Sequence, residues 1–467
     1  MKTLITLLIL VINFISYSQD NNKIKGSWLG GLKISAVELR IVFKIDENED
    51  GSLKAVLDSP DQGAYGIQVD SVQFSNSNLK LIVSAIAGFY EGKFENDSII
   101  GNWNQAGSVF PLTLKRSENI EPPKRSQVPE APLPYLVEDV TFENKEAGLT
   151  LAGTFTYPEN EESFPAVILI SGSGPQNRDE ELLGHKPFLV LADHLTRNGI
   201  AVLRFDDRGI GESTGDFSSA TTEDFTTDAL AGIEYLLSRK EVNKDKIGLL
   251  GHSEGGLVAP LAAVQSDDVD FIVMMAGPGM TGKEILRLQT GLIMKANGSD
   301  EETIKRDVEN ADKMYNVIID EPDSLIAREK LKKISDENFA EMSKEEKAVI
   351  GDSEKFFEQY ANILLSPWFR FFLAYDPYPT LLKVDVPLLA INGEKDLQVP
   401  SKENLELIEK AMKESGNENY KIAELKGLNH LFQESETGSP NEYAKIEQTI
   451  SPTALNLISD WIKMITR

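Results

Sequence analysis

The chain has 467 residues, of which 41% are hydrophobic, so it is longer than one ordinary domain and apolar enough to bury large cores. Its formal net charge of −27 argues against binding to nucleic acid or to an anionic membrane surface, because no basic stripe is present to neutralise phosphates. The absence of cysteine excludes disulfides, thiolate metal sites and a cysteine nucleophile.

The first 18 residues have the pattern of a secretory signal peptide. Lys2 precedes an apolar run over residues 4–15, and Ser16-Tyr17-Ser18 fits a small-x-small cleavage pattern. The run is too short to span a bilayer, and no later segment reaches about 18 consecutive apolar residues. We expect cleavage near Ser18 and a secreted or periplasmic mature protein. The alternative is a buried N-terminal helix.

Residues 23–116 are expected to form a small all-β domain, either a barrel or a sandwich. Short runs of β-branched and aromatic residues alternate with Gly, Asn and Asp turns, at residues 38–45, 52–58, 66–74, 79–84 and 88–95. Residues 46–51 resemble the start of an EF-hand calcium loop, but Leu57 stands where that loop needs a bidentate glutamate. A hairpin with an Asp-Gly turn is therefore favoured.

Residues 117–134 are expected to be a linker. They contain five prolines and mixed charges without a hydrophobic period. Because proline restricts the backbone, this linker should be semi-extended.

Residues 135–467 are expected to form a doubly wound α/β domain. Apolar runs of strand length lie at residues 136–143, 149–157, 166–170, 201–205, 246–250, 271–275, 388–391 and 420–425. Amphipathic stretches of helical period lie between or after them, at residues 188–195, 224–239, 402–412 and 451–465. Such alternation predicts a sheet that is covered by helices on both faces.

The strand at residues 246–250 runs into a nucleophile elbow. Residues 251–255, Gly-His-Ser-Glu-Gly, fit the Gly-x-Ser-x-Gly pattern, in which the serine occupies a sharp turn between a strand and a helix. The glycines let the strand and the helix pass closely, and the helix N-terminus favours a developing oxyanion. Ser253 is therefore the candidate nucleophile. A glycine-rich turn with an incidental serine is the alternative.

Between residues 275 and 387 the alternation is replaced by charged, helix-favouring sequence, which predicts a helical cap at about residues 280–380. Residues 366–378 are far more aromatic than their surroundings. One interpretation is that these aromatic side chains pack the cap on the core. The other is that Trp368, Phe369 and Phe372 form an apolar wall for the substrate.

The partners of a nucleophile elbow follow it in the order Ser, acid, His, each at the C-terminal end of a strand. The chain has four histidines, and only His430 comes after Ser253 in the sequence. We expect His430 to accept the serine proton as a general base. Asp396 follows the strand at residues 388–391 and is the candidate acid that orients the imidazole. Glu394 is its nearest rival.

An oxyanion hole needs two backbone N–H groups. One is expected from Glu254, directly after the nucleophile, and the other from Ser173 in the loop at residues 171–175, with Gly174 as the alternative donor. Two glycines in this loop allow the backbone to approach a substrate carbonyl. A phosphate-binding loop is disfavoured because no Gly-Lys-Ser/Thr follows.

Four motifs, taken in order, resemble the α/β-hydrolase superfamily: SGSGPQNRD (171–179), FDDRGIGES (205–213), GHSEGG (251–256) and NGEKDLQVP (392–400). The likeness covers about residues 135–467. The chain is similar in particular to bacterial secreted carboxylesterases with an N-terminal β domain, which belong to the serine aminopeptidase-like branch of the superfamily. The resemblance implies ester hydrolysis through an acyl-enzyme without metal or cofactor, with Ser253, Asp396 and His430 at the triad positions. It places residues 206–209 beside the site, where we expect a structural role.

The leading hypothesis is a carboxylesterase for small to moderately sized esters. The alternative is a secreted serine peptidase, either an aminopeptidase or a dipeptidyl-peptidase-like enzyme, that uses the same triad. No pair of carboxylates placed to bind a peptide N-terminus is evident in the sequence, which favours the ester. A catalytically silent binding protein is disfavoured because all three triad residues are present. We expect a small-molecule ester as partner; the oligomeric state and the role of the β domain stay open.

Overall fold

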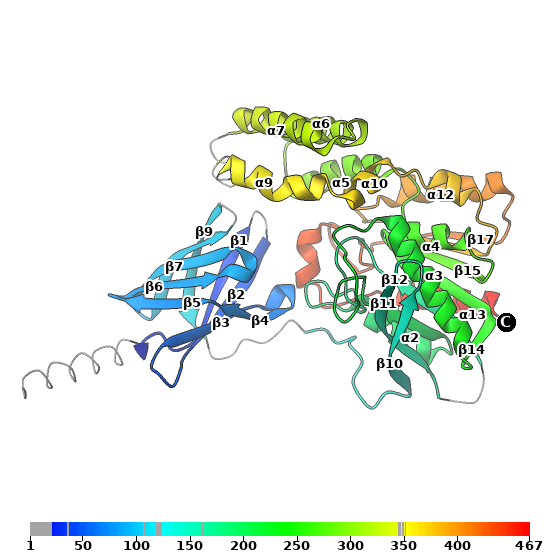
Figure 1. The fold of residues 1–467 in the computed structure, drawn as a ribbon, viewed down its shortest axis with the longest axis horizontal. Helices are drawn as coiled ribbons and strands as arrows, with labels where there is room; N and C mark the ends of the chain where they lie inside the picture. The colour runs from blue at the N-terminus through cyan, green and yellow to red at the C-terminus, as the bar shows by residue number, and fades with distance from the viewer. Residues whose placement is uncertain are drawn as a thin grey trace, which may run out of the picture. The chain divides into compact units, whose positions relative to one another are not determined.

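The computed structural model describes residues 21–34, 37–105, 108–117, 124–159, 163–343, 347, 350 and 352–467. The expected signal peptide, with its cleavage position near Ser18, lies outside these residues, as do residues 118–123 of the expected linker. The chain divides into two compact units, whose elements are labelled in Figure 1. Unit 1 comprises Met1–Lys124 and Ser335–Tyr360, and unit 2 comprises Arg125–Ile334 and Ala361–Arg467.

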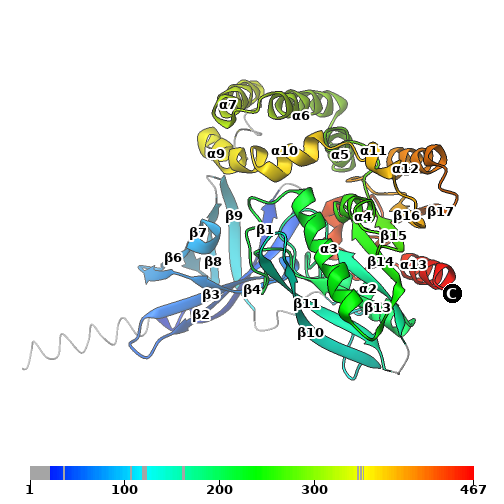
Figure 2. The same cartoon turned by 45° about the vertical axis from the view of Figure 1, so that its right-hand side comes forward.

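Unit 1 contains a nine-stranded antiparallel sheet that curls into a nearly closed barrel (Figure 2). Its strands are β1 (Gly26–Ile34), β2 (Val37–Glu47), β3 (Leu53–Ser59), β4 (Ala64–Val69), β5 (Ser71–Ser75), β6 (Asn78–Val83), β7 (Gly88–Glu95), β8 (Ser98–Gln105) and β9 (Ser108–Arg116). They follow the order β4-β3-β2-β1-β9-β8-β7-β6-β5. The barrel nearly closes because the end strands approach each other's neighbours, β4 against β6 and β5 against β3.

The core of the barrel is aromatic, as expected for this part of the chain. Trp28, Phe43 and Tyr90 are fully buried there, together with aliphatic side chains from other strands of the sheet.

The segment that resembles the start of a calcium loop forms a hairpin between β2 and β3. In this hairpin, the Asn48 N–H donates to the Ser52 carbonyl at 2.8 Å. Gly51 takes the positive φ of 83° that this turn requires.

One expected strand of the β domain was wrong. Residues 66–74 form the ends of two strands, because β4 stops at Val69 and β5 starts at Ser71. Asp70 turns the chain between them, and its carboxylate accepts a hydrogen bond from the Ser84 N–H at 2.6 Å. The two strands lie at opposite ends of the sheet order rather than in one line.

Unit 2 is built on an eight-stranded sheet in the order β10-β11-β13-β12-β14-β15-β16-β17. Its strands are β10 (Tyr135–Asn144), β11 (Leu149–Pro158), β12 (Phe164–Ile170), β13 (Ala201–Phe205), β14 (Val242–His252), β15 (Phe271–Met275), β16 (Leu388–Gly393) and β17 (Tyr420–Leu425). The pairs β10–β11 and β11–β13 are antiparallel, and all later neighbours are parallel. The expected α/β sheet is confirmed.

Helices cover both faces of this sheet, as its apolar central strands β12, β15 and β16 require. The flanking helices are α2 (Pro187–Arg197), α3 (Thr222–Ser238), α4 (Gly255–Ala263), α12 (Ser401–Ser415) and α13 (Pro452–Ile465). Adjacent strand residues show the two faces: Ile168 packs into the core with α3, α4 and α12, whereas Val167 packs into the core with α2 and α13. Pro260 lies inside α4, a helix of only nine residues.

A helical insertion separates β15 from β16. It contains α5 (Gly282–Ala296), α6 (Glu301–Asp320), α7 (Ser324–Glu341), α9 (Ser353–Leu364), α10 (Pro367–Ala374) and α11 (Tyr378–Leu381). Within unit 2, α5 and α6 contact each other and α10 contacts both (Figure 2). The division into units assigns residues 335–360 of the insertion to unit 1. In the described part of the chain, no helix is both long and apolar enough to cross a membrane.

The residues that follow the undescribed part of the linker lie against unit 2. The Arg125 guanidinium donates to the carbonyls of Leu183 and Ala444 at 2.9 and 3.0 Å. The Gln127 side chain bonds the backbone of Thr449 and Ile450 through both its oxygen and its nitrogen. Residues from Arg125 onward therefore belong to the surface of unit 2 rather than to a free connector.

Candidate active site

Ser253 occupies a strained turn between β14 and α4. Its φ of +51° is unusual for a residue with a side chain, and the turn is held by a 2.8 Å bond from its N–H to the Met275 carbonyl on β15. Because the chain reverses sharply here, the hydroxyl stands at the carboxyl edge of the sheet, where it borders a cavity.

The glycines of the motif are required by close backbone contacts. A Cβ at Gly251 would lie 1.9 Å from the Gly255 carbonyl oxygen, and one at Gly255 would lie 2.2 Å from the Ile170 carbonyl oxygen. A Cβ at Gly256 would lie 2.5 Å from the Cα atom of Gly277. No side chain fits at these distances, so the motif is a steric necessity of the crossing between β14 and α4.

Asp396 and His430 are bonded to each other. The Asp396 Oδ2 atom lies 2.7 Å from His430 Nδ1, and both side chains are buried. Asp396 Oδ1 accepts the backbone N–H groups of Gln398 and Val399 at 2.8 and 2.9 Å, which fixes the carboxylate. The rival Glu394 accepts instead from the Gly427 N–H, so it is directed away from this pair.

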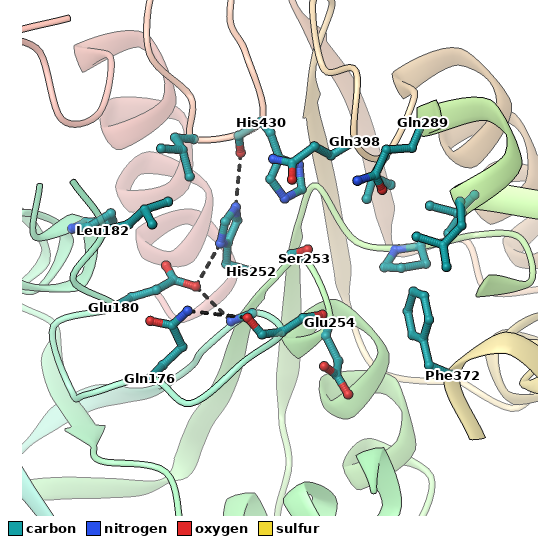
Figure 3. Close-up of a pocket in the computed structure, with 18 of the residues that line it drawn as sticks. Gln176, Glu180, Leu182, His252, Ser253, Glu254, Gln289, Phe372, Gln398 and His430 are labelled. Carbon is teal, nitrogen blue, oxygen red and sulfur yellow. Dashed lines mark hydrogen bonds and ion pairs between the residues drawn. The ribbon is translucent and has the colours of Figure 1, made fainter. Parts of the chain in front are cut away.

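Ser253 and His430 border one cavity of about 290 Å³, shown in Figure 3. Among the hydrogen bonds of the described residues, none joins the Ser253 hydroxyl to His430. The structure thus joins Asp396 to His430 by a direct bond and places Ser253 and His430 on the same cavity.

Both expected oxyanion donors also border this cavity. Ser173 and Glu254 line it, and within the described residues neither backbone N–H donates a hydrogen bond to another part of the protein. The neighbouring Gly172 N–H is different, because it already donates to Glu180 Oε1 at 2.7 Å. Two open N–H groups beside a serine can stabilise a negative charge on a substrate oxygen.

Known proteins with similar sequences support this assignment of the fold. Residues 186–306 match the family model Hydrolase_4, described as serine aminopeptidase, S33. The chain is 28% identical to esterase EstD of Thermotoga maritima over 342 residues, which cover 73% of this chain and 72% of EstD. Unit 2 is an α/β-hydrolase domain.

Two further likenesses are weaker. The uncharacterized protein YfhR of Salmonella typhi is 30% identical to the hydrolase over 129 residues, which is 27% of this chain and 40% of YfhR. The match to the solved structure of the Pyrococcus furiosus esterase Pf2001 covers 71% of this chain and 91% of the esterase chain. Its sequence identity is 15% and its TM-score is 0.42.

The aromatic residues of α10 form one wall of the hydrolase cavity. Trp368, Phe369 and Phe372 all line it, and the rings of Trp368 and Phe372 stack with centroids 5.6 Å apart. Trp368 also packs the cap on the core, because its indole N–H donates to Glu254 Oε1 at 2.8 Å. The segment therefore contacts the core and also lines the cavity; that it binds a substrate stays a prediction.

Glu254 is a buried carboxyl group next to the nucleophile. Besides Trp368, the Thr222 hydroxyl donates to its Oε1 atom at 2.7 Å. Burial raises the pKa of Glu254, and these hydrogen bonds only partly oppose that effect. The side chain thus links α3, the elbow and the cap helix α10, while its backbone N–H stays open toward the cavity.

The segment at residues 206–209 supports the loop that carries Ser173. Asp207 accepts hydrogen bonds from the Ser171 hydroxyl and the Gln176 N–H at 2.8 and 2.9 Å. Burial raises the pKa of Asp207 to about 7. Asp206 pairs with Arg178 at 2.7 Å. These contacts fit the structural role expected for the segment.

Among the cavity residues that the sequence did not single out, Glu180 and His252 interact directly with each other. Glu180 Oε1 lies 2.8 Å from His252 Nδ1, and His252 Nε2 lies 3.0 Å from the His430 carbonyl oxygen. The only sign of them in the sequence was that His252 precedes Ser253 and that Glu180 directly follows the loop motif at residues 171–179. Nothing in either pattern indicates that the two side chains meet.

Proposed function

We propose that the protein is a carboxylesterase that hydrolyses small to moderately sized esters with a Ser253, His430, Asp396 triad. The observation that carries the proposal is the Asp396–His430 pair at 2.7 Å facing the same cavity as the strained Ser253 elbow. Similarity to esterase EstD across 72% of that protein supports the ester as substrate.

In the proposed reaction, the Ser253 hydroxyl attacks the ester carbonyl while His430 Nε2 takes its proton. Asp396 holds the Nδ1 proton of His430, which leaves Nε2 free to act as the base and stabilises the imidazolium that forms. The N–H groups of Ser173 and Glu254 bind the oxyanion. His430 then protonates the departing alcohol, and water that it activates hydrolyses the acyl-enzyme.

The proposed reaction does not require a direct bond between Ser253 and His430 in this conformation. Catalytic hydrogen bonds are often long or misaligned before the substrate binds and become shorter in the complex. Rotation about the Cα–Cβ bond of serine moves the hydroxyl between staggered positions without any change in the backbone.

The size and lining of the cavity indicate which esters fit. A volume of about 290 Å³ is small for a ligand site, so a short acyl group is favoured over a long chain. No lysine or arginine belongs to its lining in the described part of the chain, and the wall from α10 is aromatic. Uncharged acyl groups are therefore preferred over acyl groups that carry a carboxylate.

A serine peptidase is the second candidate, because the matched family model is described as serine aminopeptidase. A peptide N-terminus would need carboxylates to bind its ammonium group. Glu180 and Glu254 line the cavity, but Oε1 of each already accepts two hydrogen bonds from the protein. This use of both carboxylates favours the ester.

The deciding experiment compares p-nitrophenyl acetate and butyrate with aminoacyl p-nitroanilides, using wild type and Ser253→Ala. We expect faster ester cleavage, and loss of about 10⁴-fold or more of the ester rate in Ser253→Ala with an unchanged melting temperature. Ser415→Ala, at an exposed position near the end of α12, is the control for the substitution itself. Faster anilide cleavage would reverse the order of the two candidates, and full activity in Ser253→Ala would exclude both.

A further inference from the structure

A chain of three hydrogen bonds joins the loop that carries Ser173 to the loop that carries His430. The Gly172 N–H donates to Glu180 Oε1 at 2.7 Å, the same oxygen lies 2.8 Å from His252 Nδ1, and His252 Nε2 lies 3.0 Å from the His430 carbonyl oxygen. Figure 3 shows these bonds as dashed lines through the labelled residues. His252 is thus bonded on both sides of its ring.

Both partners of the His252 ring are oxygens of acceptor groups. The carbonyl oxygen of His430 can only accept, so His252 Nε2 must carry a proton. Glu180 Oε1 already accepts the Gly172 N–H, which favours the ionised carboxylate and requires a proton on Nδ1 as well. With a proton on each nitrogen, His252 is an imidazolium.

On one side, His252 borders a small apolar cavity. Phe188 and Leu191 of α2, Met275 of β15 and Phe432 line that cavity together with Glu180. Among the described residues, further titratable groups near it are His430, whose ring centroid lies 4.9 Å away, Asp396, and Glu254, which lines the larger cavity with His252. Glu180 is therefore the direct counter-ion for a charge at this position.

The electrostatics of the site agree with this assignment. Burial acts to lower the pKa of His252, but the charge and the hydrogen bond of Glu180, together with the His430 carbonyl and the charge of Asp396, outweigh burial, so the pKa is raised overall. A raised pKa means that the ring stays protonated to a higher pH than an ordinary histidine does.

Glu180 is held in an uncommon conformation in order to reach this position. Its φ is +50°, a value that costs energy for a residue with a side chain. Its N–H donates to the Asn177 carbonyl at 2.8 Å, and its side chain is buried. Strain of this kind persists only where surrounding contacts impose it, and here those contacts are Gly172 and His252.

We propose that Glu180 and His252 form a buried carboxylate–imidazolium pair whose function is to position the oxyanion loop relative to His430. The proposal rests on the proposed hydrolytic function, because it is the geometry of that reaction that the pair maintains. Gly172 precedes the donor Ser173, and the carbonyl bonded by His252 belongs to His430 itself. A displacement of about 1 Å at either end costs on the order of 10²-fold in rate.

The first test is direct observation of the His252 ring in the full-length protein labelled with ¹⁵N-histidine. Only four histidines are present, so each signal is assigned by comparison with single substitutions. We expect both ring nitrogens of His252 to be protonated from pH 6 to pH 8, in wild type and equally in inactive Ser253→Ala. An unprotonated Nδ1 in this range would show a neutral pair and overturn the proposal.

The second test uses Glu180→Gln, which keeps the size of the side chain and removes its charge. His252 should then lose one ring proton, and kcat for p-nitrophenyl acetate should fall about 10–100-fold while KM stays within about twofold. Glu181→Gln makes the same chemical change one residue away, outside the cavity lining, and should retain wild-type kinetics. Wild-type kcat in folded Glu180→Gln would overturn the positioning role.

The two tests separate this proposal from the proposed function. If Ser253→Ala keeps full activity, the hydrolytic assignment fails whatever the state of His252. If Ser253→Ala is inactive but the His252 ring carries one proton, only the pair is wrong. The spectrum of the wild-type protein also decides the case in which Glu180→Gln does not fold, because it requires no variant at position 180.

Discussion

Asp396 accepts three hydrogen bonds, and both of its oxygens are needed as acceptors. Oδ1 receives two backbone N–H groups and Oδ2 receives the His430 ring. Asparagine has the same shape but replaces one oxygen by an NH₂ group, which cannot accept. Either the backbone anchor or the orientation of His430 is then lost.

We therefore predict that Asp396→Asn lowers kcat for p-nitrophenyl acetate by about 10⁴-fold, because the imidazole takes the wrong tautomer. The measurement is steady-state kinetics with burst analysis of the acyl-enzyme. Asp385→Asn changes the same group at an exposed position before β16 and should leave the rate unchanged. A loss of less than tenfold in Asp396→Asn would show that the carboxylate has no part in orienting His430.

The residues of the candidate site differ in how far sequence could predict them. Ser253 can be predicted from a local motif. His430 can be predicted because it is the one histidine that comes after Ser253 in the sequence, as the order of the triad requires. Glu180 and His252 lie 72 positions apart, and their contact depends on how the loop after β12 folds over the elbow. A pairing of this kind has no local pattern, so only the coordinates reveal it.

At the scale of single elements, the crossing of β14 and α4 is tightly constrained. A Cβ at Gly255 would meet the carbonyl oxygens of Ile170 and Ser171 at 2.2 and 2.8 Å. Both oxygens belong to backbone, so neither can move aside as a flexible side chain would. The spacing of β12 from α4 is therefore fixed by the missing side chain.

Gly255→Ala should lower the free energy of unfolding by about 3 kcal/mol through overpacking. Calorimetric melting of the purified variant measures this directly. The matched control is Gly291→Ala in α5, where a new Cβ would have its nearest neighbours at 3.7 and 3.8 Å and should be neutral or slightly stabilising. Equal melting temperatures for both variants would contradict the steric account of the elbow.

Element by element, periodicity predicted the sheet of unit 2 well because its central strands β12, β15 and β16 are apolar and almost entirely buried. Periodicity failed at residues 66–74, where it predicts one strand and the structure has two, β4 and β5. The inward side chains are Ile67 and Val69 before Asp70, but Phe74 after it, so the alternation changes phase. That change is the local signal of the turn, and it is short enough to be missed.

At the scale of the whole molecule, the buried His185 joins distant parts of unit 2. Its ring contacts the Thr449 hydroxyl and the Tyr443 carbonyl oxygen, each at 3.0 Å. Burial, together with the charge of Arg125, lowers its pKa to about 4. The neutral ring is therefore part of the folded state, whereas the unfolded chain takes up a proton at this residue below about pH 6.5.

A lowered histidine pKa means that stability is lost as the pH falls from about 6.5 toward 4. We predict that the advantage of wild type over His185→Asn in unfolding free energy shrinks by about 2–3 kcal/mol between pH 7 and pH 4.5. Urea denaturation of both proteins at the two pH values measures it. The raised pKa of buried Asp207 has the opposite effect, because it increases stability as the pH falls. Asp207 is present in both proteins, so its effect cancels in the comparison. A constant difference would contradict the assignment of a neutral His185.

Unit 1 is assembled from two stretches that are far apart in the sequence, residues 1–124 and residues 335–360. If the chain is divided within residues 117–134, the N-terminal fragment therefore lacks residues 335–360 of unit 1. The C-terminal fragment contains these residues without the rest of unit 1. Limited proteolysis at the same segment would cut the backbone once, and only the C-terminal product would carry residues of both units.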